Sequence, residues 1–337
     1  MKQTRCSRQK SHACTTPATL QAWIDDATVQ IELAAVDLNN GMQEPCLEAE
    51  YLAYHALLRS PGAGIQQAAR RGEVGRGVAK AMKAWRVCLR RPPPPEFPAI
   101  FAHFLEQRLQ QRLPAAYIIG EAPFAGHRFA VNADVLIPRS RIENLLDDPE
   151  RLRRLLGVKR VKRLLDLGTG SGCLAIAFAL VFPEAVVDAT DISPAALAVA
   201  AENRRRFRLE KRLQLVQSDL FGQLAGRQYS VIVSNPPYVC HATLATLPPE
   251  YGHEPVLALD GGVDGLALVE PILRQAAHFL TPGGVLICEV GDETEKLMQA
   301  RWPELPVEWI FFHFGASGVF VARRDDLLRW ATGSRWS

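Results

Sequence analysis

Short apolar runs and longer amphipathic segments alternate along the second half of the chain. The short runs fall at 163–167, 186–191, 213–218, 230–234, 285–290, 307–312 and 319–322, and the amphipathic segments at 174–182, 194–207, 266–280 and 293–300. Their lengths predict strands and helices, respectively. Because strands joined by helices need right-handed crossovers, the pattern predicts an α/β fold with a doubly wound, mostly parallel seven-stranded sheet. The last two strands are close enough in sequence to form an antiparallel hairpin at one edge.

The first 115 residues show helical spacing instead. Leu20, Trp23, Ile24 and Ala27 share one helical face, and further amphipathic segments begin at 47 and at 97, the latter after four consecutive prolines at 92–95. From 117 to 137 the apolar period becomes two, which predicts a β-hairpin. The expected organisation is therefore a helical domain over 1–115, a hairpin linker over 116–145 and an α/β domain over 146–330.

The composition is that of an ordinary globular chain, with 48% hydrophobic and 22% charged residues among 337. It excludes collagen-like, low-complexity and fully disordered classes. The longest apolar run covers 173–182, about half a membrane span. The basic start lacks the apolar stretch of a secretory signal, so we expect a cytoplasmic protein without a membrane partner. Seven scattered cysteines without a CxxC pair predict reduced thiols and no metal site.

Charge is distributed unevenly along the chain. Residues 1–115 carry a net +5, residues 116–165 a net +4 and residues 166–337 a net −6. A basic front half beside an acidic rear half is typical of a chain whose front faces an anionic partner such as RNA. Solvated surface charge produces the same split, and the sequence leaves both interpretations open.

A glycine-rich turn follows the first strand of the predicted sheet. It contains Asp166, Gly168, Thr169, Gly170, Ser171 and Gly172. Glycines let a backbone turn tightly and approach a ligand, and this turn lies at the carboxyl edge where open α/β sheets bind ligands. Dinucleotide loops have the spacing GxGxxG, whereas this one is GxGxG, with Cys173 in place of the last glycine. The spacing favours S-adenosylmethionine over NAD.

Acidic residues follow the next two strands. Asp191, with Ile192 beside it, lies about twenty residues beyond the glycine turn, where a carboxylate can accept from both ribose hydroxyls. Asp191 could instead cap the following helix, although Ser193 suits that role better. After the third strand, Asp219 is expected to accept from the adenine amine and Leu220 to cover the ring.

The fourth strand ends in Asn235-Pro236-Pro237-Tyr238. The two prolines fix the backbone and remove two donors, so the Asn235 side-chain oxygen and the Pro236 carbonyl form a rigid pair of acceptors. Such a pair suits an –NH₂ group with two hydrogens to donate, and Tyr238 offers a face for a planar group. We therefore predict that Asn235, Pro236 and Tyr238 are catalytic, that all four residues bind substrate, and that Asn235 also contacts the cofactor. The alternative is that this motif is only a rigid turn after the strand.

The glycine turn, Asp191 and the Asn235–Tyr238 motif together resemble the family of methyltransferases that modify protein glutamine side chains. Upstream, 117–120 and 124–129 resemble its hairpin, and 135–139 resembles the segment leading into its catalytic domain. Pro138-Arg139-Ser140 resembles the branch that methylates large-subunit ribosomal protein three, rather than the release-factor branch. The segments 247–255, 264–266 and 315–320 also resemble that branch.

The resemblance implies a class I, Rossmann-like methyltransferase of a ribosomal protein, linked to ribosome assembly. S-adenosylmethionine would be its cofactor, S-adenosylhomocysteine its product, and ribosomal RNA a contact of its basic front half. Methylation of a release factor, methylation of the adenine amine in nucleic acid, and a non-enzymatic RNA-binding assembly factor are the alternatives. Near the motif, His253 and Glu254 are expected to order a loop rather than transfer protons, and Glu289 to give polar support.

Overall fold

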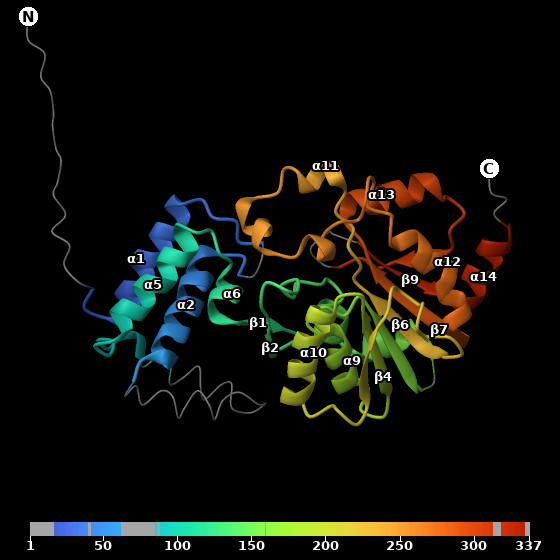
Figure 1. The fold of residues 1–337 in the computed structure, drawn as a ribbon, viewed down its shortest axis with the longest axis horizontal. Coiled ribbons are helices and arrows are strands. Elements are labelled where there is room, and N and C mark those ends of the chain that lie inside the picture. Colours follow the sequence, from blue (N-terminus) through green and yellow to red (C-terminus); the bar gives the residue numbers. More distant parts are fainter. Residues whose placement is uncertain are drawn as a thin grey trace, which may run out of the picture. The chain divides into compact units, whose positions relative to one another are not determined.

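The computed structural model describes residues 17–39, 42–61, 85, 88–158, 160–312 and 318–333. They divide into two compact units. The first comprises the described residues up to 35 and those of 44–109, and the second comprises those of 36–43 and all from 110 onward. Figure 1 shows the elements of each.

The first unit is helical, as predicted. Helices α1 (Leu20–Leu33), α2 (Pro45–Arg59) and α5 (Phe97–Leu109) bury one apolar face each. Trp23 meets Phe97 and Phe101 edge-on. The core also holds a charge pair, because Arg108 and Glu48 are almost fully buried and lie 2.7 Å apart. Burying two charges is tolerated only when they are paired.

The second unit is built on a seven-stranded sheet of order β5-β4-β3-β6-β7-β9-β8. The strands are β3 (Arg163–Leu167), β4 (Val186–Asp191), β5 (Leu213–Gln217), β6 (Tyr229–Ser234), β7 (Leu280–Glu289), β8 (Val307–Trp309) and β9 (Val319–Arg323). The first five pair in parallel, and β9 pairs antiparallel with both β7 and β8. This confirms the doubly wound, mostly parallel sheet and its antiparallel edge.

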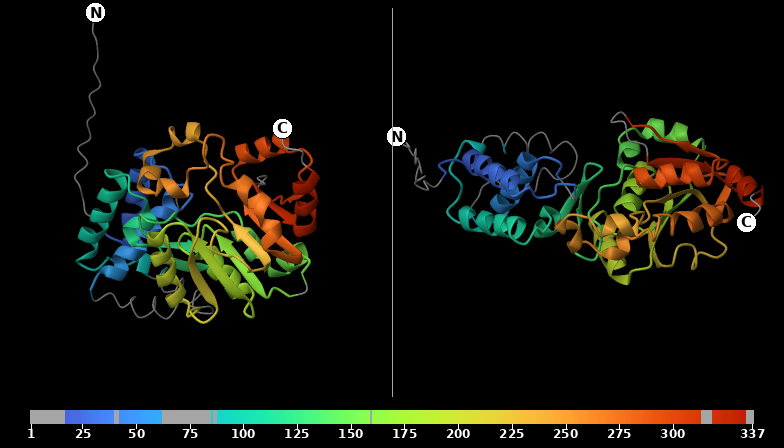
Figure 2. Two further views of the ribbon diagram at one scale, coloured as in Figure 1. Left: turned by 45° about the vertical axis from the view of Figure 1, so that its right-hand side comes forward. Right: turned by 90° about the horizontal axis from the view of Figure 1, so that it is seen from above.

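Helices cover both faces of the sheet. On one face pack α8 (Pro149–Leu156) and α9 (Cys173–Val181), with α10 (Pro194–Arg206) beside α9. On the other pack α12 (Val269–Phe279), α13 (Asp292–Arg301) and α14 (Arg324–Gly333). Figure 2 shows this layering around the twisted strands. Leu164 faces the first core and Leu165 the second, so β3 is apolar on both sides, as is typical of a buried parallel strand.

The hairpin differs from its prediction in extent. Its strands are β1 (Glu121–Phe124) and β2 (His127–Ala130), whereas 117–119 are helical in α6 (Ala115–Ile119) and 131–137 form no strand. Gly120 ends α6 with φ +83°, a conformation that glycine adopts without strain. The alternation of apolar positions over 117–137 therefore predicted longer strands than the structure has.

The hairpin is also no separate linker. Phe129 stacks on Phe207 at 5.1 Å between ring centroids, and the backbone of Ala130 is hydrogen-bonded by Asn203 of α10. These contacts make β1 and β2 part of the second unit, which begins at 110 rather than 146 and also takes in 36–43.

Several smaller elements were not predicted. They are α7 (Glu143–Leu146), α11 (His241–Leu244), two 3₁₀ turns η2 (Pro249–His253) and η3 (Val256–Ala258), and helices α8 and α14. In α8 the arginines lie outward while Leu152 and Leu156 are fully buried. A basic stretch that we expected only at the surface thus carries a core-facing helix. Most of 60–95, the segment 315–317 and Cys6 and Cys14 lie outside the described residues.

Candidate active site

The predicted site residues gather at one edge of the sheet. They follow β3, β4, β5 and β6, which are neighbouring parallel strands whose carboxyl ends align. Leu167 at the end of β3 pairs with Thr190 on one side and Ser234 on the other. The chain runs outward from β3 first toward β5 and then toward β7, so the site lies at the switch point where α/β sheets open a crevice.

Backbone conformation in the glycine turn depends on glycine. Gly168, Gly170 and Gly172 have φ of +71°, +52° and +82°. At Gly172 a Cβ would come within 3.3 Å of Ala200, so this glycine serves the packing of α9 on α10. At Gly168 and Gly170 no described atom lies within 4 Å of where a Cβ would stand. The first two glycines therefore leave open space of the kind a ligand's close approach requires.

Asp166 supports the turn from below. It is fully buried, and its Oδ2 accepts from Thr169 Oγ1 at 2.6 Å and from the Ala175 backbone at 3.0 Å. Its Oδ1 has no hydrogen-bond partner among the described residues. Burial raises the pKa of Asp166 to about 7, and the two hydrogen bonds oppose the shift. The carboxylate thus fixes the turn and keeps one acceptor spare.

Asp191 joins the turn to the next strand. Its Oδ2 accepts from Gly170 N at 2.9 Å, and its Oδ1 accepts from Ser193 N at the same distance. The alternative role, capping α10, belongs to Ser193, whose Oγ accepts from Ala196 N. Burial raises the pKa of Asp191. Ile192 beside it is 48% exposed, an apolar surface next to the turn.

Asp219 and Leu220 occupy a tight turn after β5. Leu220 has φ +43°, held by Ser218 Oγ, which donates to its carbonyl at 2.8 Å. Asp219 is exposed and its carbonyl accepts from Gly222. The backbone of Ser218 donates to Asp191 O at 3.0 Å, which ties this turn to the end of β4.

The Asn235–Tyr238 motif leaves β6 directly beside the glycine turn. Ser234 Oγ donates to Leu167 O at 2.9 Å, which joins the ends of β6 and β3. Asn235 is half-buried, and its Oδ1 is inaccessible to solvent without a hydrogen-bond partner among the described residues. A buried acceptor without a partner is costly, typically by about 1–3 kcal/mol. Such an atom is expected where a ligand supplies the missing donor.

Tyr238 is held by close backbone approaches. A Cβ at Gly261 would lie 2.7 Å from Tyr238 Cα, and one at Gly265 would lie 2.5 Å from its carbonyl oxygen. Thr294 Oγ1 donates to the same carbonyl at 3.3 Å. The Tyr238 hydroxyl donates to Glu289 Oε1 at 3.5 Å. Glycines are thus required at 261 and 265 because the motif passes against them.

Comparison with known proteins places these features in a family. A profile of the methyltransferase small domain matches residues 150–247. The ribosomal protein uL3 glutamine methyltransferase of Bordetella pertussis is 46% identical over 225 residues, which are 66% of this chain and 74% of that protein. The Xanthomonas campestris enzyme of the same name is 46% identical over 66% of this chain and 71% of its own length. The Xylella fastidiosa enzyme is 40% identical over 83% of this chain and 82% of its own length.

The chain belongs to the family of ribosomal protein uL3 glutamine methyltransferases. The predicted resemblance to the glutamine methyltransferases, and to their ribosomal branch, is confirmed. The chain is accordingly an enzyme of the methyltransferase class.

Sequence reasoning missed the residues that support this candidate site. Asn203 is fully buried on α10, where its Nδ2 donates to Ser171 O at 2.8 Å and to Ala130 O at 3.0 Å. Its Oδ1 accepts from Ala130 N. One side chain thereby joins the glycine turn to the hairpin. The only signal in the sequence is a short polar residue within the apolar face of a helix.

A second brace uses the loop after α11. Glu254 is buried and accepts from Arg139 Nη1 at 2.8 and 2.9 Å and from Ile137 N at 3.2 Å. His253 contacts the Gln111 carbonyl at 2.9 Å. These contacts agree with the loop-ordering role expected for 253–254.

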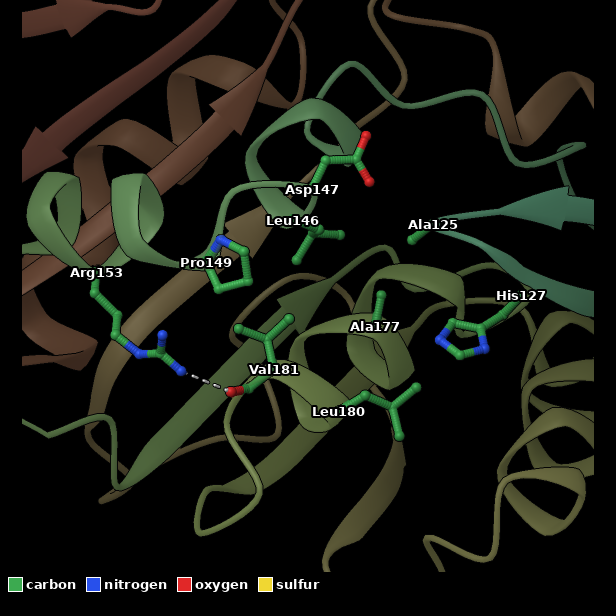
Figure 3. Close-up of a pocket in the computed structure, with 9 residues that line it drawn as sticks. All are labelled: Ala125, His127, Leu146, Asp147, Pro149, Arg153, Ala177, Leu180 and Val181. Atoms are coloured by element: carbon green, nitrogen blue, oxygen red, sulfur yellow. Dashed lines mark hydrogen bonds between the residues drawn. The ribbon is translucent and has the colours of Figure 1, made fainter. Parts of the chain in front are cut away.

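Outside the site, a cavity of about 390 Å³ lies between the hairpin turn, α7, α8 and α9. Figure 3 shows Arg153 on one side of it, donating to Val181 O, and His127 on the other. None of the predicted site residues lines it. Within the described ranges, no three His, Cys, Asp or Glu side chains are grouped as metal ligands. No helix of those ranges is both long and apolar enough to cross a membrane.

Proposed function

We propose that this enzyme transfers a methyl group from S-adenosylmethionine to the side-chain amide nitrogen of a glutamine in ribosomal protein uL3. S-adenosylhomocysteine is the coproduct. Family membership supports the substrate, since the relatives carry that activity in their names. The observation that carries the proposal is the buried Asn235 Oδ1 without a partner. A glutamine amide brings two N–H donors to such an acceptor.

The motif residues act on the amide by gripping its hydrogens. Asn235 Oδ1 and the Pro236 carbonyl accept one N–H each, and the Tyr238 ring packs on the planar group. An amide nitrogen attacks poorly because its lone pair is delocalised. Two fixed acceptors favour a pyramidal nitrogen and stabilise the positive charge that develops on it. Aligning the reacting atoms in this way is worth roughly 7–11 kcal/mol in favourable systems.

We assign the cofactor to the residues at the carboxyl edge of β3, β4 and β5. The backbone of 168–172 would pass along its methionine part, because Gly168 and Gly170 leave open space there. Asp191 would accept from the ribose hydroxyls, with Ile192 beside it, and Asp219 and Leu220 would flank the adenine. When bound, S-adenosylmethionine supplies an electrophilic methyl group, so the reaction needs no metal.

The remaining assignments concern partners. The helical unit is proposed to dock the ribosomal protein, and the basic front half to contact ribosomal RNA. Most Lys and Arg of 1–115 lie outside the described residues, so this part rests on charge alone. Because the proposed substrate is a ribosomal protein, we expect the enzyme in the cytoplasm.

Incubation with radiolabelled S-adenosylmethionine and purified uL3 tests the proposal, with mass mapping of the labelled peptide. We expect one methylated glutamine in uL3, and with Asn235→Ala a labelling rate about 100–1,000-fold lower. A release factor and adenine-containing DNA are assayed in parallel. Label on either of these alone, with uL3 unlabelled, would reject the assignment.

A further inference from the structure

Three consecutive residues before the catalytic sheet bind carboxylates from three different segments. Arg139 pairs with Glu254 of the loop after α11, Ser140 Oγ donates to Glu289 Oε2 at the end of β7, and Arg141 pairs with Asp292 at the start of α13. We name residues 139–141 the clip. Its partners lie 115 to 151 positions away in sequence. The clip therefore ties the segment before β3 to the loop at Glu254 and to the turn between β7 and α13.

Glu289 is the central partner of the clip. It is 2% exposed and lies next to the end of β6, since Cys288 pairs with Ser234. Its carboxylate accepts from Ser140 Oγ, from the backbone N–H of Arg141, and from the Tyr238 hydroxyl at 3.5 Å. Glu289 is thus the point where the clip and the substrate motif are joined by side chains.

The rest of Tyr238 is fixed through its backbone or by contact. Its carbonyl accepts from Thr294, and a Cβ at Gly291 would lie 3.1 Å from its ring carbon Cδ2. Within the described parts of the chain, the Tyr238 hydroxyl makes its hydrogen bond to Glu289. Burial raises the pKa of Tyr238, so the hydroxyl stays a donor. The close approach of Gly291 therefore limits rotation of the Tyr238 ring about its Cβ–Cγ bond, and the hydrogen bond to Glu289 limits the tilt of the ring.

We propose that Ser140 and Glu289 are positioning residues that hold the Tyr238 ring in the orientation in which the motif receives the substrate amide. The proposal rests on the glutamine methylation proposed above. It gives Ser140 a physical task. The hydroxyl of Ser140 fixes the carboxylate, and the carboxylate fixes the ring.

The charges around Glu289 make the positioning of Tyr238 depend on pH. The Arg141 guanidinium and the Ser140 hydrogen bond favour the carboxylate, whereas burial disfavours it more strongly and raises the pKa of Glu289 to about 7. Asp292 offsets Arg141, and Cys288 and Tyr238 beside Glu289 remain uncharged because their own pKa values are raised. The Ser140 and Tyr238 hydroxyls can donate or accept. A protonated Glu289 therefore keeps these partners but exchanges a charge-assisted hydrogen bond for a weaker neutral one.

The test uses the full chain with Glu289→Gln, Ser140→Ala, Tyr238→Phe and the double variant Glu289→Gln/Tyr238→Phe. Each single change should lower kcat on uL3 about 10–100-fold, as for loss of a hydrogen bond to a charged group, with cofactor affinity within twofold. The double variant should be no slower than the slower single variant, because both changes act on the contact between Tyr238 and Glu289. The wild-type kcat should fall as pH drops through 7, and Glu289→Gln should lack this limb.

A matched control pair lies at another point of the same sheet. Tyr229 donates to the buried Asp188 at 2.8 Å, a tyrosine–carboxylate pair away from the carboxyl edge. Asp188→Asn and Tyr229→Phe should lower the melting temperature but leave kcat unchanged. Additive losses in the double variant, or an unchanged kcat for Glu289→Gln, would overturn the positioning role.

A measurement that does not depend on the substrate separates this proposal from the proposed function. In a crystal structure of Glu289→Gln, the Tyr238 ring should be tilted or spread over two orientations. An unchanged ring would refute the inference even if uL3 were not the substrate. Conversely, an inactive wild-type enzyme with a displaced ring in the variant would reject the substrate and retain the positioning role.

Discussion

Removing the side-chain oxygen of Asn235 should separate catalysis from stability. In the free enzyme this oxygen is buried without a described partner, so it contributes no hydrogen bond to the fold. It carries a desolvation cost of about 1–3 kcal/mol that a substrate N–H relieves. Asn235→Ala should therefore leave the melting temperature unchanged or slightly raised. A structural residue of similar burial would behave in the opposite way.

The effect on catalysis follows from the same atom. An acceptor that meets positive charge developing on nitrogen is worth more in the transition state than in the ground state, so its loss should appear in kcat. Loss of one preorganised polar group typically costs about 3–4 kcal/mol, or about 100–1,000-fold. Because Asp191 and the glycine turn are untouched, cofactor affinity should change much less.

Single-turnover methylation of uL3 and thermal unfolding measure the two quantities on one preparation. Asn235→Asp is the sharper comparison, because a carboxylate keeps the acceptor and adds a charge that attracts the sulfonium into an unreactive position. A kcat for Asn235→Ala within threefold of the parent would mean that the motif is a rigid turn. A loss of activity that parallels a loss of stability would show that the oxygen serves the fold.

Three further predictions address the supports of the site. Asp191→Ala should raise the dissociation constant of the cofactor about 10–100-fold by calorimetry, and unchanged affinity would remove Asp191 from the ribose. Asn203→Ala leaves three buried backbone groups without their partner, so denaturant unfolding should show a loss of more than about 2 kcal/mol, against well under 1 kcal/mol for the exposed Asn144→Ala. The pKa of Asp166 is raised to about 7, so its contribution to stability is complete below its ordinary value near 3.8 and is lost as pH rises through 7. Asp166→Asn should flatten that fall in the free energy of unfolding, and an unaltered pH profile would contradict the shift.

The sheet and the place of the Asn235–Tyr238 motif in it were predictable because their signals are local. Each strand and its following helix lie within about thirty residues, and the residues after parallel strands must meet at one edge. Asp191 and Asn235 could thus be placed before any contact was known. The antiparallel pairing of β8 and β9 at one edge was predicted, but the order β7-β9-β8 was not. A hairpin pattern does not say which of its two strands pairs with the rest of the sheet.

What could not be predicted depends on contacts between distant positions. Ser140 meets Glu289 across 149 positions, and Asn203 meets Ala130 across 73. A single serine or asparagine carries no periodic signal that would announce such a partner. Helix α8 was missed for a different reason, because its arginines masked the spacing of Leu152 and Leu156.

The position of β9 affects how the enzyme is made. This strand is synthesised after the other six strands of its sheet, yet it lies inside the sheet, between β7 and β8. Until it emerges, β7 has an open edge, and β8 has no neighbour to pair with. Unpaired edges of this kind invite association with other chains. The sheet can therefore close only after residues 319–323 have been synthesised, and nonsense mutations before 319 should yield aggregates rather than a shortened enzyme.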